Sequence, residues 1–285
     1  MALENMTNML KKAMDNKYAV GAFNIIDYNS MKAVVAAAEE VQAPVIVQTS
    51  VKTVKLWGYK TMISWFKEIA SAVEIPVAIH LDHCKEIEVI QNCIAYGWTS
   101  VMIDASHKPF DENITLSKQV VKMAKAKNVS VEAELGEIGG VEDDKIVSEQ
   151  DAYLADPDKA EIFCRELNLD CFAPAIGTAH GIYKGEPKIA FDRLEEIAQR
   201  TRVPIALHGG TGLSPEVFQR CIKLGCAKVN ISTQLKHTFI DEFIAYHQSK
   251  PNEYEPVKLL AYQYERIKET VKDSIQLFGS TGKAD

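Results

Sequence analysis

Eight short apolar segments recur along the chain, and longer segments with helical spacing separate them. The short segments cover residues 20–25, 45–50, 77–83, 100–106, 130–136, 171–177, 205–209 and 228–232. Near-continuous apolar strands that alternate with helices indicate an α/β fold in which helices cover a parallel sheet. Eight such units in 285 residues favour a closed (β/α)8 TIM barrel over an open, doubly wound sheet. No GxGxxG follows the first strand, which disfavours a dinucleotide-binding fold.

Two segments exceed what such a barrel requires. Residues 137–158 are acidic, contain Gly139 and Gly140, and have the length that is typical of functional lids or disordered loops. From residue 235 onward the chain has two helical patterns, which the polar segment 250–256 separates. We therefore expect a single barrel domain over residues 1–285 with a C-terminal helical extension at roughly 234–285. This tail either contacts another subunit or packs across the barrel.

Composition and charge narrow the classes of function. Apolar residues make up 47% of the chain, enough for a large core, and the net charge of −7 argues against nucleic acid and anionic membrane as partners. No apolar run reaches the length of a transmembrane helix, and residues 1–10 lack the pattern of a signal peptide. The six cysteines form no CxxC pair and are expected to be reduced thiols. These features predict a cytoplasmic protein.

Polar side chains stand at the C-terminal end of almost every predicted strand. They are Asn24, Ser50, Asp82, His83, Asp104, Glu134, His180, His208 and the segment 230–233. Active sites of (β/α)8 barrels form at the C-terminal ends of the strands. We therefore expect these side chains to converge at one mouth of the barrel.

Three of these residues are histidines: His83, His180 and His208. A single histidine near a strand end is usually a structural residue that makes a hydrogen bond. Three at matching ends form a ligand set that leaves one position open in a catalytic zinc site, so the pattern predicts bound Zn²⁺. Asp104 and Glu134 are carboxylates that orient the ligands, a second cation site, or structural hydrogen-bond acceptors.

Glycines and small hydroxyl residues follow the sixth, seventh and eighth strands. They are Gly181, Gly209, Gly210, Thr211, Gly212, Asn230, Ser232 and Thr233. Backbone N–H groups in such segments form anion cradles, and phosphate sites of these barrels cluster after strands seven and eight. Lys184 either adds positive charge to this cradle or is a surface lysine.

Along almost its whole length the sequence resembles the class II, metal-dependent ketose-bisphosphate aldolases, a family that includes the fructose- and tagatose-bisphosphate aldolases. The matching motifs are GAFN at 21–24, HLDH at 80–83, VMIDASH at 101–107, VEAELG at 131–136, GGVED at 139–143, AHGIYKG at 179–185, LHGGTG at 207–212 and KVN at 228–230. The resemblance implies that His83, His180 and His208 hold zinc. It also implies that Asp82 exchanges the proton of the substrate's C4 hydroxyl and that Glu142, on the long loop, handles the proton at C3.

The resemblance further implies how the substrate is bound. Asn24 and Ser50 would line the pocket, and Asp104 and Glu134 match positions that bind a second metal ion in some members. The substrate would be a phosphorylated ketose, with a monovalent cation near its phosphate, and the chain would form a homodimer or homotetramer. The positions that match the dihydroxyacetone-phosphate end are Gly181, Lys184, Gly209, Gly210, Thr211, Asn230, Ser232 and Thr233.

The chemistry of this reaction agrees with the residue types. Retro-aldol cleavage of a ketose 1-phosphate develops negative charge on the C2 oxygen, which Zn²⁺ stabilises without a Schiff base. A lysine-based mechanism would need a desolvated lysine inside the barrel. The first seven strands carry no interior lysine, and Lys228 is expected at the far rim of the eighth strand.

Two regions depart from the family pattern. Cys84, Lys85 and Glu86 follow the Asp-His pair, where glycine and serines are common, and Val257 stands in a tail segment that commonly has an arginine. Valine cannot bind phosphate as an arginine fork does. Unless these changes are neutral, the group at the far end of the substrate is a carboxylate, as in 6-phospho-5-keto-2-deoxygluconate, or a sulfonate, as in sulfofructose 1-phosphate. The remaining option is a phosphate held by Lys52, Lys55 or Lys85.

Two rival functions use the same residues differently. A non-catalytic, aldolase-like partner subunit would need no metal, but the presence of Asp82, the three histidines and Glu142 argues against it. A zinc-dependent hydrolase on the same barrel would not need the glycine-rich phosphate cradle.

Overall fold

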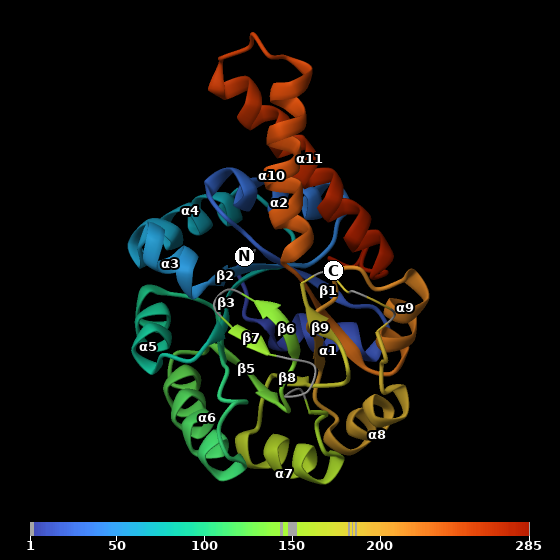
Figure 1. The fold of residues 1–285 in the computed structure, drawn as a ribbon. Helices are drawn as coiled ribbons and strands as arrows, with labels where there is room; N and C mark the ends of the chain where they lie inside the picture. Colours follow the sequence, from blue (N-terminus) through green and yellow to red (C-terminus); the bar gives the residue numbers. More distant parts are fainter. Residues whose placement is uncertain are drawn as a thin grey trace.

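The computed structural model describes residues 3–142, 145–147, 153–181, 183, 185 and 187–284, with the backbone alone for 140–142 and 145–147. Eight parallel strands form a closed barrel in the order β1-β11-β10-β8-β5-β4-β3-β2 (Figure 1). This confirms the predicted TIM barrel. The strands are β1 (Val20–Asn24), β2 (Val45–Ser50), β3 (Val77–Cys84), β4 (Ser100–Ile103), β5 (Ser130–Leu135), β8 (Cys171–Pro174), β10 (Ile205–Leu207) and β11 (Cys226–Ile231).

Helices surround the barrel and follow its strands (Figure 1). The sequence explains where the helix after residue 214 begins. The Ser214 side chain caps it by accepting a hydrogen bond from the Val217 N–H, and Pro215 occupies its first turn. The surrounding helices are α2 (Tyr28–Glu40), α3 (Val51–Trp57), α4 (Tyr59–Ser71), α5 (Ile87–Tyr96), α6 (Phe110–Lys125), α7 (Pro157–Leu167), α8 (Phe191–Thr201) and α9 (Pro215–Lys223).

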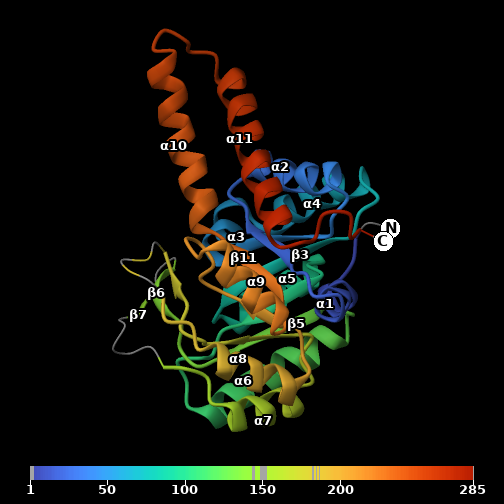
Figure 2. The ribbon, with the colours of Figure 1, turned by 90° about the vertical axis from the view of Figure 1, so that its right-hand side faces the viewer.

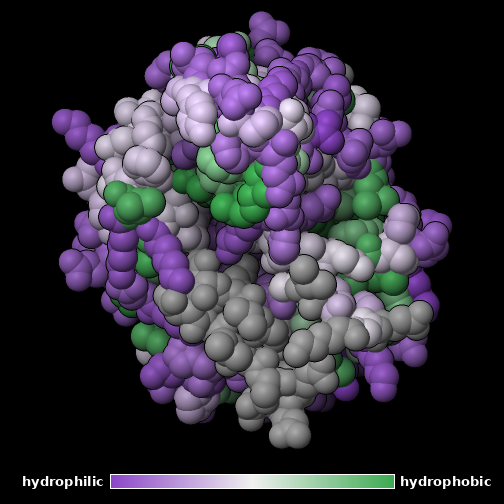
Figure 3. All heavy atoms as spheres, turned by 45° about the horizontal axis from the view of Figure 1, so that its top comes forward, coloured by the Kyte–Doolittle hydropathy of each residue, from purple (hydrophilic) through white to green (hydrophobic). Residues whose placement is uncertain are grey.

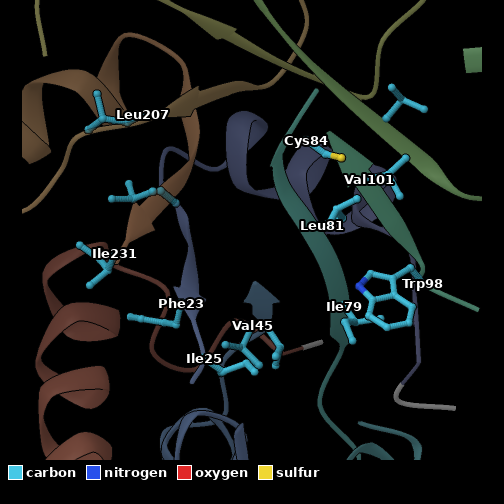
Figure 4. Packing of buried hydrophobic residues seen from close by; sticks show 14 of the residues in the cluster. Phe23, Ile25, Val45, Ile79, Leu81, Cys84, Trp98, Val101, Leu207 and Ile231 are labelled. Atoms are coloured by element: carbon cyan, nitrogen blue, oxygen red, sulfur yellow. The ribbon is translucent and has the colours of Figure 1, made fainter. Parts of the chain in front are cut away.

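The core has an outer and an inner part. The outer part lies between strands and helices, and Figure 4 shows Ile79 and Leu81 of β3 within it. Because side chains alternate along a strand, the intervening His80 and Asp82 point into the barrel. The inner part consists of small and aliphatic side chains that pack against the buried face of α1 (Met6–Asp15).

Helix α1 closes the N-terminal end of the barrel. Leu3, just before it, pairs with Val77 at the start of β3. Figure 2 shows α1 at one end of the barrel and strands β6 (Gly139–Glu142) and β7 (Lys145–Val147) at the other. Because α1 covers the N-terminal end, a functional site is expected at the C-terminal mouth of the barrel.

A small three-stranded sheet, ordered β7-β6-β9, lies at this mouth. Strand β9 (Ala179–His180) pairs in parallel with β6, so that Gly140 stands opposite His180. The sequence predicted a functional lid or a disordered loop over 137–158, and the described part of this segment includes two paired strands, β6 and β7. Two glycines and very short runs carry too little alternation to predict them.

Helices α10 (Thr233–Ser249) and α11 (Pro256–Leu277) form the C-terminal extension, and the predicted linker separates them. Figure 2 shows the two helices side by side, with their connection projecting away from the barrel. The C-terminal part of α11 buries Ile267, Val271 and Ile275. Among the described residues, no helix combines the length and the hydropathy that crossing a membrane requires.

Candidate metal and substrate site

The strand ends bring the predicted site residues together at the C-terminal mouth of the barrel. Asp82, Asp104, Glu134 and His208 are almost completely buried, and His83 and His180 are partly exposed. The ionisable groups thus lie below the surface of the mouth, where only the two histidines reach solvent.

His83 points into the site because the backbone of β3 is irregular there. Strict alternation would turn His83 away from the barrel axis, since Asp82 points inward. The φ angle of His83 is +43°, in the left-handed region that non-glycine residues rarely adopt. The pairing of β3 with β4 also shifts its register between Leu81 and Cys84. Local strain of this kind is typical of functional sites.

The three histidines form one cluster. Ring nitrogens of His83, His180 and His208 all lie within 4.8 Å of one another. His83 Nε2 and His208 Nδ1 are only 2.7 Å apart. Three imidazoles at such distances form the donor set that suits a catalytic zinc ion, so these residues fit a metal site.

Two buried carboxylates lie beside this cluster. Nδ1 of His83 is 3.3 Å from Asp104 Oδ2 and 3.7 Å from Glu134 Oε2, and the three residues form a second group that could hold a cation. Asp104 Oδ1 accepts a hydrogen bond of 2.6 Å from the Ser106 hydroxyl. His83 therefore belongs to both groups, with one ring nitrogen directed to each.

Amide side chains hold the Asp82 carboxylate. Asn24 Nδ2 donates to Asp82 Oδ2 at 3.0 Å, and Asn230 Nδ2 donates to Oδ1 at 3.2 Å. Gln48 Nε2 donates to Asn24 Oδ1 at 2.8 Å and lies 3.4 Å from Asp82 Oδ2. Three amides that can only donate here orient the carboxylate as an acceptor, and only 3% of Asp82 is exposed.

The glycine-rich loops contact each other closely. Gly209 has a φ of +66°, and a Cβ atom there would lie 2.5 Å from the Ala179 carbonyl oxygen. Tyr183 joins the same loops, since its hydroxyl donates to Gly209 O at 2.7 Å and accepts from Ala179 N–H at 3.0 Å. The two loops can therefore contact each other this closely because residue 209 is a glycine and has no side chain.

The remaining predicted residues occupy the same mouth or lie outside the described residues. Ser50 pairs in register with Asp82, and its hydroxyl accepts a hydrogen bond of 3.2 Å from the Thr53 N–H. Gly181 has a φ of +90°, and Gly210 is buried beside the Asn230 carbonyl. Thr211, Ser232 and Thr233 lie half-buried around the first turn of α10. Lys184 and the side chain of Glu142 lie outside the described residues.

Sequence reasoning missed a buried polar layer beneath these residues: Gln48, His80, Glu132 and Lys228, all completely buried. Each precedes a predicted site residue by two positions, so the period of a strand could have revealed them. The expectation for Lys228 was wrong. Strand β11 begins at Cys226, and Lys228 Nζ lies inside the barrel, 2.8 Å from Glu132 Oε2.

Burial and the charges in this layer favour neutral His80 and His208 and an ionised Glu132. Burial and the Lys228 ammonium lower the pKa of His80 well below its ordinary value. Burial and nearby His83 lower the pKa of His208. Burial alone would raise the pKa of Glu132, but Lys228 and His208 lower it well below its ordinary value. A neutral imidazole is the form that binds a metal ion.

The chain resembles aldolases along its whole length. The family model described as fructose-bisphosphate aldolase class-II matches residues 4–283. A fructose-bisphosphate aldolase from Geobacillus stearothermophilus is 45% identical, over 100% of this chain and 99% of the relative. A 6-phospho-5-dehydro-2-deoxy-D-gluconate aldolase from Bacillus licheniformis is 39% identical, over 100% and 97%.

Solved structures of aldolases have the same fold as this chain. The crystal structure of the YdjI aldolase from Escherichia coli K12 superposes with a TM-score of 0.88 at 31% identity, covering 99% of this chain and 100% of that one. A putative fructose-1,6-bisphosphate aldolase from Coccidioides immitis gives a TM-score of 0.88 at 26% identity, covering 97% and 96%.

Proposed function

This chain is an aldolase of the class II fructose-bisphosphate aldolase family, and we propose that it uses bound Zn²⁺ to cleave a ketose 1-phosphate reversibly. The products are dihydroxyacetone phosphate and a three-carbon aldehyde. The observation that carries the proposal is the cluster of three histidine nitrogens within 4.8 Å, next to a carboxylate that amides hold. His83, His180 and His208 would bind the ion. When bound, the ion stabilises negative charge at the substrate's carbonyl oxygen.

Asp82 would accept the proton of the C4 hydroxyl and return it in the reverse reaction. Its neighbour in sequence is His83, so a substrate that reaches the histidines also reaches this carboxylate. Asn24 and Asn230 orient Asp82 from two sides, because each donates a hydrogen bond to one of its oxygens. A general base must lie within hydrogen-bond reach of the proton that it abstracts, so its orientation is the first requirement.

Glu142 would transfer the second proton, at C3, from the loop over the mouth. The backbone supports this role, because Gly140 pairs with His180 and residue 142 follows two positions later in the same strand. A carboxylate on such a loop approaches the substrate from a different direction from Asp82, as the two proton transfers require.

The loops after β9, β10 and β11 would bind the phosphate of the dihydroxyacetone end. Backbone N–H groups near Gly181, Gly209 and Gly210 and the first turn of α10 supply donors for an anion. A monovalent cation near the phosphate would assist. The side chains that we assign to this end are those of Lys184, Thr211, Asn230, Ser232 and Thr233.

The far end of the substrate is where we expect a departure from fructose 1,6-bisphosphate. Lys55 Nζ is 2.7 Å from Glu86 Oε1, so its charge is already countered. Val257 is 70% exposed on the projecting tail, and Arg266 pairs with Glu242 and Glu269. A relative named for 6-phospho-5-dehydro-2-deoxy-D-gluconate supports a carboxylate at this end. A sulfonate, or a phosphate held by Lys52 or Lys85, is the alternative.

The protein would act in the cytoplasm as a homodimer or homotetramer. The projecting tail helix α10 exposes Ile240, Phe243 and Ile244. Figure 3 shows hydrophobic surface on the face that includes this tail. Contiguous exposed apolar side chains are typical of contact surfaces.

A substrate panel with a coupled reductase tests the proposal. Release of dihydroxyacetone phosphate would be measured from fructose 1,6-bisphosphate, tagatose 1,6-bisphosphate, 6-phospho-5-keto-2-deoxygluconate and sulfofructose 1-phosphate, with and without a chelator. We expect chelator-sensitive release. No release and no bound metal would favour a partner subunit, and hydrolysis without dihydroxyacetone phosphate would favour a hydrolase. Preferred cleavage of fructose 1,6-bisphosphate would contradict the assignment of the far end.

A further inference from the structure

A chain of charged and polar contacts runs beneath the histidine cluster. Lys228 Nζ lies 2.8 Å from Glu132 Oε2, and Glu132 Oε1 lies 2.7 Å from His208 Nε2. On the other side of the ring, His208 Nδ1 lies 2.7 Å from His83 Nε2. The ring of His208 therefore stands between a carboxylate and the cluster.

We propose that Glu132 and Lys228 are a positioning pair that fixes the tautomer of His208, so that its Nδ1 is the nitrogen offered to the metal ion. Neither residue contacts the substrate in this assignment. The inference deepens the proposed function, since it rests on a metal site at the three histidines.

The tautomer follows from what each group can do. An ionised carboxylate only accepts hydrogen bonds, so the short contact with Glu132 places the proton of neutral His208 on Nε2. The lone pair then lies on Nδ1, which faces His83. Asn230 Nδ2 is also 3.3 Å from His208 Nε2, but it is a donor and is used by Asp82 at 3.2 Å. Its second hydrogen would favour a lone pair on Nε2, but the contact of Nε2 with the Glu132 carboxylate is shorter, 2.7 Å against 3.3 Å, and charge-assisted, so Glu132 decides the tautomer.

Lys228 binds one oxygen of Glu132, and the other oxygen is left to accept a hydrogen bond from the ring of His208. A completely buried carboxylate needs a counter-charge, and the ammonium comes from β11, across the barrel interior from β5. His80 adds nothing comparable, because its Nε2 is 3.7 Å from Glu132 Oε2. A buried ion pair is a weak source of stability, since desolvation offsets the attraction. Orientation of a ligand explains why the pair is placed here.

The pair predicts an unusual relation between two substitutions. In Glu132→Gln, the Lys228 ammonium can only donate, so it takes the amide oxygen and the amide NH₂ faces His208 Nε2. His208 Nε2 must then accept, and its proton moves to Nδ1, which removes the lone pair from the metal side. In the double variant Glu132→Gln/Lys228→Met the amide is free to turn its oxygen to His208. The second substitution should therefore restore what the first one lost.

The test compares wild type, Glu132→Gln and the double variant by two measurements. Zn²⁺ affinity would be measured by competition with a chromogenic chelator, and the tautomer of His208 by long-range ¹H–¹⁵N correlation on the metal-free, histidine-labelled protein. We expect Glu132→Gln to weaken Zn²⁺ binding about 10- to 100-fold, with a proton on Nδ1. We expect the double variant to regain most of the affinity and the wild-type tautomer.

Asp170→Asn is the matched control. Asp170 is also a carboxylate next to β5, but its oxygens accept from Thr7 Oγ1 and Val131 N–H, away from the histidines. It should leave affinity and tautomer unchanged, and thermal unfolding would verify that each variant is folded.

The outcomes separate this inference from the proposed function. Equal affinity and an unchanged tautomer in Glu132→Gln would overturn the positioning role. A double variant no better than Glu132→Gln would overturn the role of Lys228. If wild type bound no divalent ion, the metal-dependent function would fall. The tautomer in the metal-free proteins would then still support or overturn the action of the pair on His208.

Discussion

Asp82 and His83 are neighbours on β3, yet both side chains point into the barrel, because His83 adopts a φ of +43°. The amides of Asn24 and Asn230 hold Asp82, and the other histidines surround His83. The two residues that we propose as the general base and as a metal ligand therefore lie next to each other on one strand.

Substitution of Asp82 by alanine should abolish turnover and leave the metal bound. The change removes a proton acceptor but none of the three histidine nitrogens, so we expect catalysis to fall by about a hundred- to ten-thousand-fold. Dihydroxyacetone phosphate release and the zinc content of the purified variant would be measured together. Asp82→Asn, which keeps the side-chain volume, is the matched control and should behave in the same way. Loss of zinc in both variants would show that Asp82 is itself a ligand.

Removal of one histidine should remove the metal. His180→Ala takes away one of three donors, so its Zn²⁺ affinity should fall by more than the roughly 10- to 100-fold expected for a residue outside the ligand set. His237→Ala is the control, because His237 lies exposed on α10 beside Asp241. The measurement is zinc titration of chelator-treated protein. Unaltered affinity in His180→Ala would exclude it from the ligand set.

The metal-free protein should lose stability as the pH falls below neutrality. The pKa of buried His80 lies well below 6.5 in the fold, so the unfolded chain binds a proton that the folded chain does not. Stability therefore rises with pH through this range, by up to about 1.4 kcal/mol per pH unit for each such histidine. His208, whose pKa is also lowered, adds a change of the same sign.

Denaturant unfolding between pH 5 and 7.5 would measure this dependence. His80→Gln should reduce the slope, because the group that resists protonation is gone. His237→Gln, at an exposed position, should leave the slope as it is in wild type. A slope that is the same in all three proteins would contradict the role of His80.

Most of the barrel could be predicted from the sequence, because its strands are nearly continuous apolar runs. The start of β11 was misplaced by two residues, since Cys226 and Ala227 are small and lie just after Gly225. That error put Lys228 at the rim, although it lies in the interior. The pairing of β6 with β9 was not predicted, because a strand of two residues has no period to detect.

The side chains at the mouth were predicted because ionisable or amide residues follow the apolar run near the C-terminal end of most strands. Alternation alone cannot predict both Asp82 and His83 as inward-facing, since it assigns neighbours to opposite faces. The inward turn of His83 depends on its backbone angle and on the register shift against β4, which are tertiary features. Glu132 lies two residues before Glu134 on β5. Because alternate residues of a strand face the same side, the inward position of Glu134 could have predicted that of Glu132.

A side chain at Gly209 should disrupt the proposed phosphate cradle. In Gly209→Ala the new Cβ would meet Ala179 O at 2.5 Å, and the φ of +66° already disfavours alanine. The loop has to move, which costs about 1–3 kcal/mol and separates it from the residue before His180. We expect a higher KM for the phosphorylated ketose and a lower melting temperature. Gly185→Ala is the control, because no described residue places an atom within 4 Å of a Cβ there, and it should change neither value. An unchanged KM in Gly209→Ala would place the phosphate away from this loop.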